Sequence, residues 1–242
     1  MRVKEIKLMK TKIYGIGVGP GDPDLITIKA KQILAKANLV VYPAPENGSS
    51  IAKKIASPHF PKICEELPVY ISMSTNRFPA MKIYKSASEK IFNAALENKT
   101  VVILCEGDPF FYGSFMYLFG LIRKRYNVEV IPGVSSLMAS AAILETPLAA
   151  GNDILTVLPA PLADDALEKR INMADAFAII KLGRHFSRIR RLLEKLGLLE
   201  NSVYIERATM ENERIVDIVD VVESDVPYFS IILVHKRNKA WL

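Results

Sequence analysis

The sequence has few of the residues that build disulfide frameworks or metal centres. Its 242 residues include only two cysteines, Cys64 and Cys105, and three histidines. Both thiols lie in apolar stretches, and neither has a Cys or His neighbour at metal-ligand spacing. We therefore expect two buried thiols and no bound metal.

Long hydrophobic runs are also missing. The longest uncharged stretches, residues 110–122 and 130–144, contain Gly, Pro or Ser and fall short of the roughly 18 apolar residues of a membrane span. The first ten residues mix charges with single apolar residues, which is unlike a signal peptide. We expect a cytoplasmic protein that makes no membrane contact.

Clusters of basic residues are absent, although the chain is basic overall. Lys and Arg number 32 against 26 for Asp and Glu, which gives a net charge of +6 and a pI near 9.2. This balance suits an anionic partner. However, the sequence has no run of five Lys or Arg and no aromatic residues interleaved with basic ones, so we expect no nucleic-acid partner.

Strand-like and helix-like segments alternate along the chain, and this alternation predicts the α/β class. Strands are expected at residues 12–18, 39–42, 100–105 and 128–131, with helices at 24–37, 50–56, 80–98 and 112–124 between or after them. The continuous apolar core of 100–105 predicts a central strand of a parallel sheet. Residues 57–78, with three prolines and mixed polarity, give no clear assignment.

A change of pattern near residue 150 predicts two domains. The aperiodic stretch 146–153 (TPLAAGND) is followed by a new strand and helix series. We expect an N-terminal α/β domain over 1–150 and a C-terminal mixed α/β domain over 151–242. Three closing segments rich in Val, Ile and Tyr predict antiparallel strands in the second domain, at residues 203–207, 214–219 and 228–234.

Glycine-bearing loops follow three of the predicted strands, at residues 14–27, 105–114 and 131–136. The first is not a dinucleotide fingerprint, because Pro20 and Asp22 stand where its third glycine would be. Loops after parallel strands gather at one edge of a sheet, where ligands bind. These glycines either shape turns or line a ligand site, and Asp108 either caps the next helix or contacts a ligand.

The motifs of these loops resemble those of the tetrapyrrole (corrin/porphyrin) methylases: GVGPGDPDLIT at 17–27, CEGDPFFYGSFMYL at 105–118 and VIPGVSS at 130–136. The resemblance implies a two-lobed homodimer with S-adenosylmethionine in the cleft between the lobes. The central motif is most similar to that of enzymes that methylate C20 of precorrin-2 or cobalt-factor II in cobalamin (vitamin B12) biosynthesis. The alternative is another tetrapyrrole methylase, such as the uroporphyrinogen III C-methyltransferase of siroheme synthesis. More distant alternatives are family relatives that modify a protein side chain or ribosomal RNA, and a binding protein without activity.

The resemblance also implies which residues bind the cofactor: Pro20, Gly107, Asp108, Phe111, Ser135, Ser136, Leu182 and Ala208. It identifies no catalytic residue, although Glu106, Asp108 and Tyr112 are polar candidates for a base, and His59 and His185 are weaker ones. The implied substrate carries many carboxylates, which a basic protein attracts. Four arginines either meet these carboxylates or form an exposed helix face: Arg184, Arg188, Arg190 and Arg191. The same two alternatives apply to Arg77.

Overall fold

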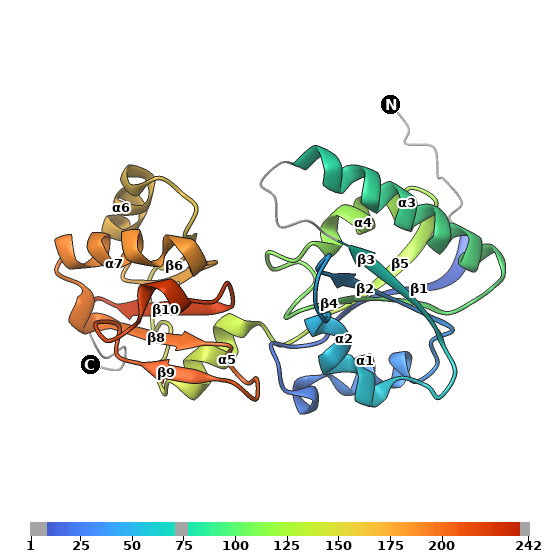
Figure 1. Ribbon diagram of the computed structural model, residues 1–242, viewed down its shortest axis with the longest axis horizontal. Helices are drawn as coiled ribbons and strands as arrows, with labels where there is room; N and C mark the ends of the chain where they lie inside the picture. The colour runs from blue at the N-terminus through green and yellow to red at the C-terminus, as the bar shows by residue number, and fades with distance from the viewer. Residues whose placement is uncertain (1–8, 71–76, 238–242) are drawn as a thin grey trace. The chain divides into compact units, whose positions relative to one another are not determined.

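The computed structural model describes residues 9–70 and 77–237, and the chain divides into two compact units, Met1–Ser135 and Ser136–Leu242. Each unit has its own sheet and its own helices (Figure 1). The junction that the sequence suggests near residue 150 lies beyond helix α5 (Ser136–Ile143). This helix groups with the second unit because it packs against that unit's strand β10 (Ser230–His235).

The first unit is built on a parallel sheet, as predicted. Its strands are β1 (Met9–Gly17), β2 (Leu39–Ala44), β3 (Glu65–Tyr70), β4 (Val101–Cys105) and β5 (Tyr126–Ile131), in the order β3-β2-β4-β1-β5. Every neighbouring pair is parallel. All five residues of β4 are buried, and β4 occupies the centre of the sheet, which confirms the expectation from its apolar run.

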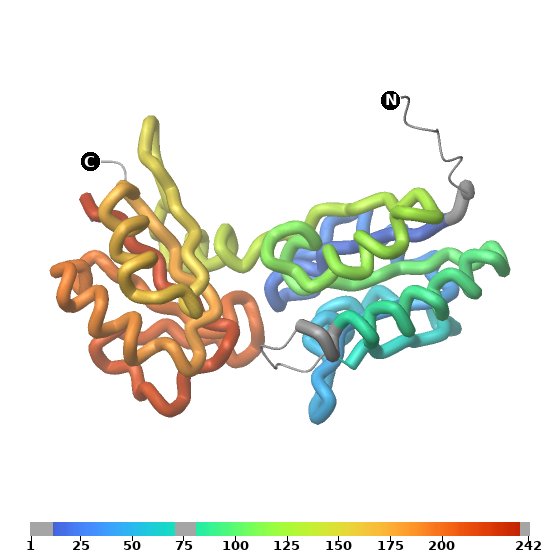
Figure 2. The backbone as a smooth tube through the Cα atoms, turned by 90° about the horizontal axis from the view of Figure 1, so that it is seen from above, coloured from blue at the N-terminus to red at the C-terminus, as the bar shows by residue number. Residues whose placement is uncertain are grey.

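Helices cover both faces of this sheet (Figure 1). Helices α1 (Ile28–Leu34) and α2 (Ile51–Ala56) pack on one face, and α3 (Arg77–Leu96) and α4 (Phe115–Ile122) pack on the other. The long α3 lies against α4 (Figure 2). Each of α1 and α2 begins at a hydroxyl cap, because Thr27 Oγ1 accepts from Ala30 N and Ser50 Oγ accepts from Lys53 N.

Two parts of the first unit differ from the sequence prediction. The expected helix over 24–37 is a short 3-10 turn, Pro23–Leu25, followed by α1, because Asp22 caps the turn and Thr27 starts a new helix. The stretch without an assignment contains the edge strand β3, of whose six residues three are exposed and one is Pro68. Cys64, expected to be buried, directly precedes β3 and is only partly covered, whereas Cys105 is buried as expected.

The second unit has a mixed sheet. Its strands are β6 (Leu155–Pro159), β7 (Ala176–Ile180), β8 (Ser202–Glu206), β9 (Arg214–Val216) and β10, in the order β6-β7-β10-β8-β9. The pair β6 and β7 is parallel, while β10 is antiparallel to β7 and β8, and β9 is antiparallel to β8. The predicted antiparallel arrangement of the closing strands is therefore confirmed.

Helices α6 (Asp164–Met173) and α7 (Phe186–Lys195) cover the apolar core of the second unit. Short 3-10 turns, Gly183–His185, Leu199–Asn201 and Glu223–Asp225, complete this unit. Over residues 9–70 and 77–237, no helix combines the length and apolar character that crossing a membrane requires.

Candidate functional site

The first two glycine loops of the first unit are joined to each other. Gly107 N donates to Gly19 O at 2.8 Å, and Gly19 N donates to Gly107 O at 3.3 Å. Both glycines have left-handed backbones, with φ of 81° and 61°, so glycine is favoured at both positions. The bridge places Pro20, which follows Gly19 and is buried, next to the loop that begins at the end of the central strand.

Asp108 joins the second loop to the third. Its Oδ1 accepts from Phe110 N at 2.9 Å, and its Oδ2 accepts from Gly133 N at 3.1 Å. Phe111 N donates in turn to Asp108 O at 3.3 Å. Asp108 does not cap the next helix, because α4 begins only at Phe115. Asp108 thereby connects the loop that contains Gly107 and Phe111 to the third loop, which contains Ser135 and Ser136.

The glycines at this edge let three backbones come close together. A Cβ on Gly17 would lie 2.5 Å from Gly107 O and 2.6 Å from Gly133 N, closer than real Cβ contacts. Close packing of the three loops therefore explains Gly17 and Gly133 without a ligand. Ser135 and Ser136 close the third loop and are partly exposed; Ser135 ends this unit and Ser136 begins α5.

Glu106 stands out among the polar candidates for a base. Burial raises the pKa of its carboxyl, although hydrogen bonds from its own backbone N–H and from Ala52 N oppose the shift. Tyr112 is exposed, has a left-handed backbone with φ of 57° and lies edge-on to Phe111 at 5.1 Å. A carboxyl with a raised pKa at the end of a central strand is typical of groups that exchange protons.

The two histidine candidates differ in surroundings. His59 Nε2 lies 3.3 Å from Pro23 O, a contact that ties the 3-10 turn Ser57–His59, which follows α2, to the first loop. Burial, together with the charges of Arg184 and Arg188, lowers the pKa of His185.

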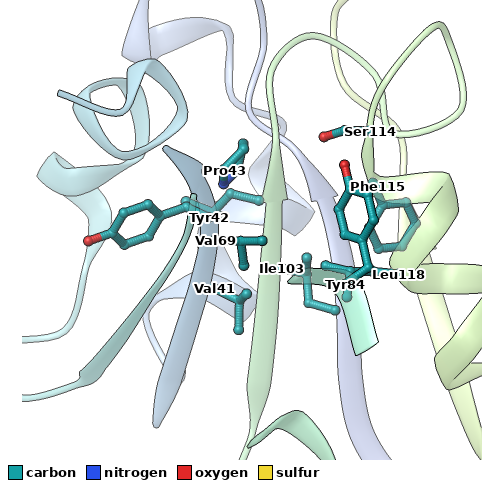
Figure 3. Close-up of a pocket in the computed structure, with 10 residues that line it drawn as sticks. Val41, Tyr42, Pro43, Val69, Tyr84, Ile103, Ser114, Phe115 and Leu118 are labelled. Atoms are coloured by element: carbon teal, nitrogen blue, oxygen red, sulfur yellow. The ribbon is translucent and has the colours of Figure 1, made fainter. Parts of the chain in front are cut away.

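A small apolar pocket lies at the carboxyl ends of β2 and β4 (Figure 3). Tyr84 and Ser114 bring hydroxyl groups to it and point toward each other. Burial raises the pKa of Tyr84, and the hydrogen bond with Ser114 opposes that shift. The Tyr84 ring also stacks on Tyr117 at 5.4 Å. No motif in the sequence singled out Tyr84, since a tyrosine within a helical pattern is usually part of a core.

The second unit brings Leu182 and Ala208 to one edge of its sheet. Ile180, the last residue of β7, pairs with Ile231, and Glu206, the last residue of β8, pairs with Ser230. The turns that follow β7 and β8 therefore flank the start of β10. Leu182 lies in the first turn and Ala208 in the second, so two residues that are distant in sequence share one edge.

Both of these turns contain residues with left-handed backbones. Lys181 has φ of 62° and Gly183 of 39°, while Arg207 has φ of 50° and Thr209 of 67°. Such a conformation costs a non-glycine residue about 1–3 kcal/mol and is enriched at ligand sites. Burial lowers the pKa of Lys181. No sequence signal pointed to Lys181, because backbone strain cannot be read from a residue's type.

Two aromatic residues lie between these turns. Tyr228 and Phe229 are 43% and 39% exposed, with their rings edge-on at 5.2 Å. Phe229 O accepts from Arg207 N at 2.7 Å, and a Cβ on Gly183 would lie 3.7 Å from Tyr228 Cα. The edge therefore combines apolar side chains with backbone polar groups, which suits a small ligand that has both apolar and polar parts.

The arginines near α7 mostly bind acidic and backbone groups of their own unit. Arg188 pairs with Asp164 and also donates to Ala160 O, and Arg190 pairs with Glu223. Arg191 Nε donates to Ser187 O at 3.3 Å, and Arg184 is exposed. These contacts favour the helix-face interpretation. The side chain of Arg77 lies outside the described residues.

Comparison with known sequences identifies the family to which these loop motifs belong. The sequence model of the Tetrapyrrole (Corrin/Porphyrin) Methylases matches residues 12–220. The chain belongs to this family. The match covers the three glycine loops of the first unit and both turns of the second, so it places all eight expected cofactor residues within the methylase sequence.

Individual methylases support the assignment. The precorrin-2 C(20)-methyltransferase of a Sinorhizobium species is 35% identical over 235 residues, covering 92% of this chain and 94% of the relative. The cobalamin biosynthesis protein CobIJ of Mycobacterium tuberculosis is 38% identical over 227 residues, which is 90% of this chain but 45% of CobIJ, so the chain spans about half of that relative. The crystal structure of the cobalt precorrin-4 methyltransferase CbiF has a TM-score of 0.73 at 25% identity and covers 94% of this chain.

Proposed function

We propose that this tetrapyrrole methylase transfers a methyl group from S-adenosylmethionine to C20 of precorrin-2 or of its cobalt-containing counterpart in cobalamin biosynthesis. The observation that carries the proposal is the similarity to the Sinorhizobium precorrin-2 C(20)-methyltransferase over nearly the full length of both chains. The net charge of +6 agrees with a substrate that carries many carboxylates.

We propose that both sheet edges contribute to holding S-adenosylmethionine. When bound, this cofactor supplies a methyl group on an electrophilic sulfonium. Pro20, Gly107 and Phe111 contact it from the joined loops, and Asp108 keeps those loops in register. Ser135 and Ser136 offer hydroxyl groups, and Leu182 and Ala208 offer apolar contact to the purine.

The protein's main task in this reaction is to orient the reacting carbon and to exclude water. The methylated carbon also loses a proton, and the raised pKa of Glu106 favours that carboxyl as the acceptor. The mechanism needs no nucleophilic side chain. Cys105 could not act as a nucleophile in any case, because burial raises its pKa to about 12.

An anaerobic assay with methyl-labelled S-adenosylmethionine tests the function. Metal-free precorrin-2, cobalt-precorrin-2 and uroporphyrinogen III are offered in parallel, and NMR locates the label. Label at C20 of either precorrin supports the proposal, and the preferred substrate identifies the metal state. Transfer only to uroporphyrinogen III would replace the proposal with siroheme synthesis.

We further propose that the protein is a cytoplasmic homodimer, as the family resemblance implies. Light scattering coupled to size-exclusion chromatography tests the dimer. A mass near that of one 27.0 kDa chain at micromolar concentration would contradict it.

A further inference from the structure

A buried carboxylate lies directly before the turn that carries Ala208. Glu206 ends β8 and is 1% exposed. Its Oε1 accepts from the Tyr204 hydroxyl at 2.9 Å, and its Oε2 accepts from Arg207 Nη1 at 3.1 Å. Arg214 Nη1 lies 3.6 Å from the same Oε2. A carboxylate buried this deeply persists only when it is paired and hydrogen-bonded, and Glu206 meets that condition.

The turn after Glu206 is held at several backbone positions. Arg207 N donates to Phe229 O at 2.7 Å, and Thr209 N donates to Glu213 Oε2 at 2.6 Å. Met210 N donates to Arg207 O at 2.9 Å. Arg207 and Thr209 both have left-handed backbones, so these bonds hold a strained conformation in place on both sides of Ala208.

The side chain of Glu206 adds a constraint that the backbone bonds do not supply. It fixes the guanidinium of Arg207, whose backbone is already fixed by Phe229. Burial and the neighbouring carboxylate raise the pKa of Tyr204, so the Tyr204 hydroxyl stays protonated and keeps donating to Glu206. Without the carboxylate, a buried hydroxyl and two cations would lose their shared acceptor.

We propose that Glu206 is a positioning residue for the cofactor. By anchoring Arg207 and Tyr204, it keeps the Arg207–Thr209 turn in the left-handed form that presents Ala208 to the purine of S-adenosylmethionine. This inference rests on the proposed function.

Asp153 provides a matched control within the same unit. Its side chain is 4% exposed, and its carboxylate accepts from Ala150 N at 2.8 Å and contacts His235 Nε2 at 3.0 Å and Arg237 at 2.7 Å. His235 pairs with Ala176, the first residue of β7, so this cluster lies at the opposite edge of the sheet. Removing either carboxylate leaves buried donors without an acceptor, but only Glu206 adjoins the turn.

The test compares Glu206→Ala, Glu206→Gln and Asp153→Ala by calorimetric titration with S-adenosylhomocysteine and by thermal unfolding. We expect both alanine variants to lower Tm. Glu206→Ala should weaken binding about tenfold, the effect of losing one buried interaction, and Glu206→Gln should restore part of the affinity because its amide oxygen still accepts. Asp153→Ala should bind as the wild type does. In the methyl-transfer assay, KM for the cofactor should rise in Glu206→Ala while KM for the tetrapyrrole stays unchanged.

Three results would overturn the inference. The first is that Glu206→Ala binds S-adenosylhomocysteine as tightly as the wild type does. The second is that Asp153→Ala weakens this binding as much as Glu206→Ala does. The third applies if Glu206→Ala does not fold: a folded Glu206→Gln variant then has the affinity of the wild type and an unchanged KM for the cofactor. Absence of binding by the wild-type protein would overturn the proposed function itself, a result distinct from the first three.

Discussion

Gly107 exchanges two backbone hydrogen bonds with Gly19, and this pair holds the loop after the central strand β4 against the loop after β1. The pairing lies outside the regular sheet, between the two loops that contain Pro20 and Gly107, both expected to contact the cofactor. Asp108 extends the connection to Gly133. The geometry of the three loops therefore depends on two backbone hydrogen bonds and on the Asp108 side chain.

Gly17→Ala should destabilise the protein strongly, because the new Cβ would meet Gly107 O at 2.5 Å and Gly133 backbone atoms at 2.6 Å. We expect a loss of about 2 kcal/mol or more in the free energy of unfolding, measured by urea denaturation. Gly120→Ala in α4 is the control. A Cβ there meets nothing within 4 Å, so this variant should gain about 0.5–1 kcal/mol. Equal stability of the two variants would refute close loop packing.

Asp108→Ala should lower both stability and cofactor affinity, because Gly133 N and Phe110 N lose their acceptor. We expect a loss of about 1–3 kcal/mol in the free energy of unfolding. In Asp217→Ala, a local bond to Val219 N is lost at an exposed site, so the variant should stay close to the wild type. Unchanged affinity for S-adenosylhomocysteine in Asp108→Ala would show that the loop connection does not matter for binding.

Glu106→Gln should raise stability at neutral pH, because burial raises the pKa of Glu106 and the ionised form is costly in the folded state. The advantage should shrink as the pH falls toward about 4.3, where the unfolded wild type also takes up a proton. Thermal unfolding from pH 7 to pH 4 measures this. If Glu106 accepts the substrate proton, kcat should fall in the same variant while cofactor binding is retained. A fully active Glu106→Gln enzyme would exclude it as the base.

Asp153→Asn should reduce the sensitivity of the fold to acid. The hydrogen bond with His235, the N–H of Ala150 and the charge of Arg237 lower the pKa of Asp153. Its stabilising effect is therefore complete above about pH 3.9 and is lost as the pH falls through the lowered value. The difference in Tm between wild type and variant should be largest near neutral pH and disappear in acid. A difference in Tm that does not change with pH would contradict a stabilising role for the ionised Asp153 carboxylate.

Cys105 should resist thiol reagents in the folded protein, because burial, together with the charge of Glu106, raises its pKa to about 12. Cys64 is only partly covered and should react first, although burial raises its pKa as well. Titration with a chromogenic disulfide at pH 8 should give one thiol in the native state and two after denaturation. In Cys64→Ser the native signal should vanish, and a remaining native signal would show that the covered thiol is accessible.

The amino-acid sequence by itself determined the class of the fold and the family. Alternating apolar segments specify the strands and helices, the uninterrupted apolar run of β4 places that strand at the centre of its sheet, and the three loop motifs carry the resemblance. These signals are local, so they can be read without knowing which residues meet. The edge strand β3 has no such signal, because half of its residues are exposed and they follow no clear apolar pattern.

Only the tertiary structure decided which residues meet. Asp108 accepts a hydrogen bond from Gly133, and Tyr84 meets Ser114, although each pair is distant in sequence. The left-handed backbones of the turns that contain Leu182 and Ala208 are likewise seen only in the folded chain. Glu206 appears in the sequence as an ordinary charged residue, yet it is 1% exposed and holds three side chains. Burial and pairing depend on which strands become neighbours, and chain order alone does not contain that information.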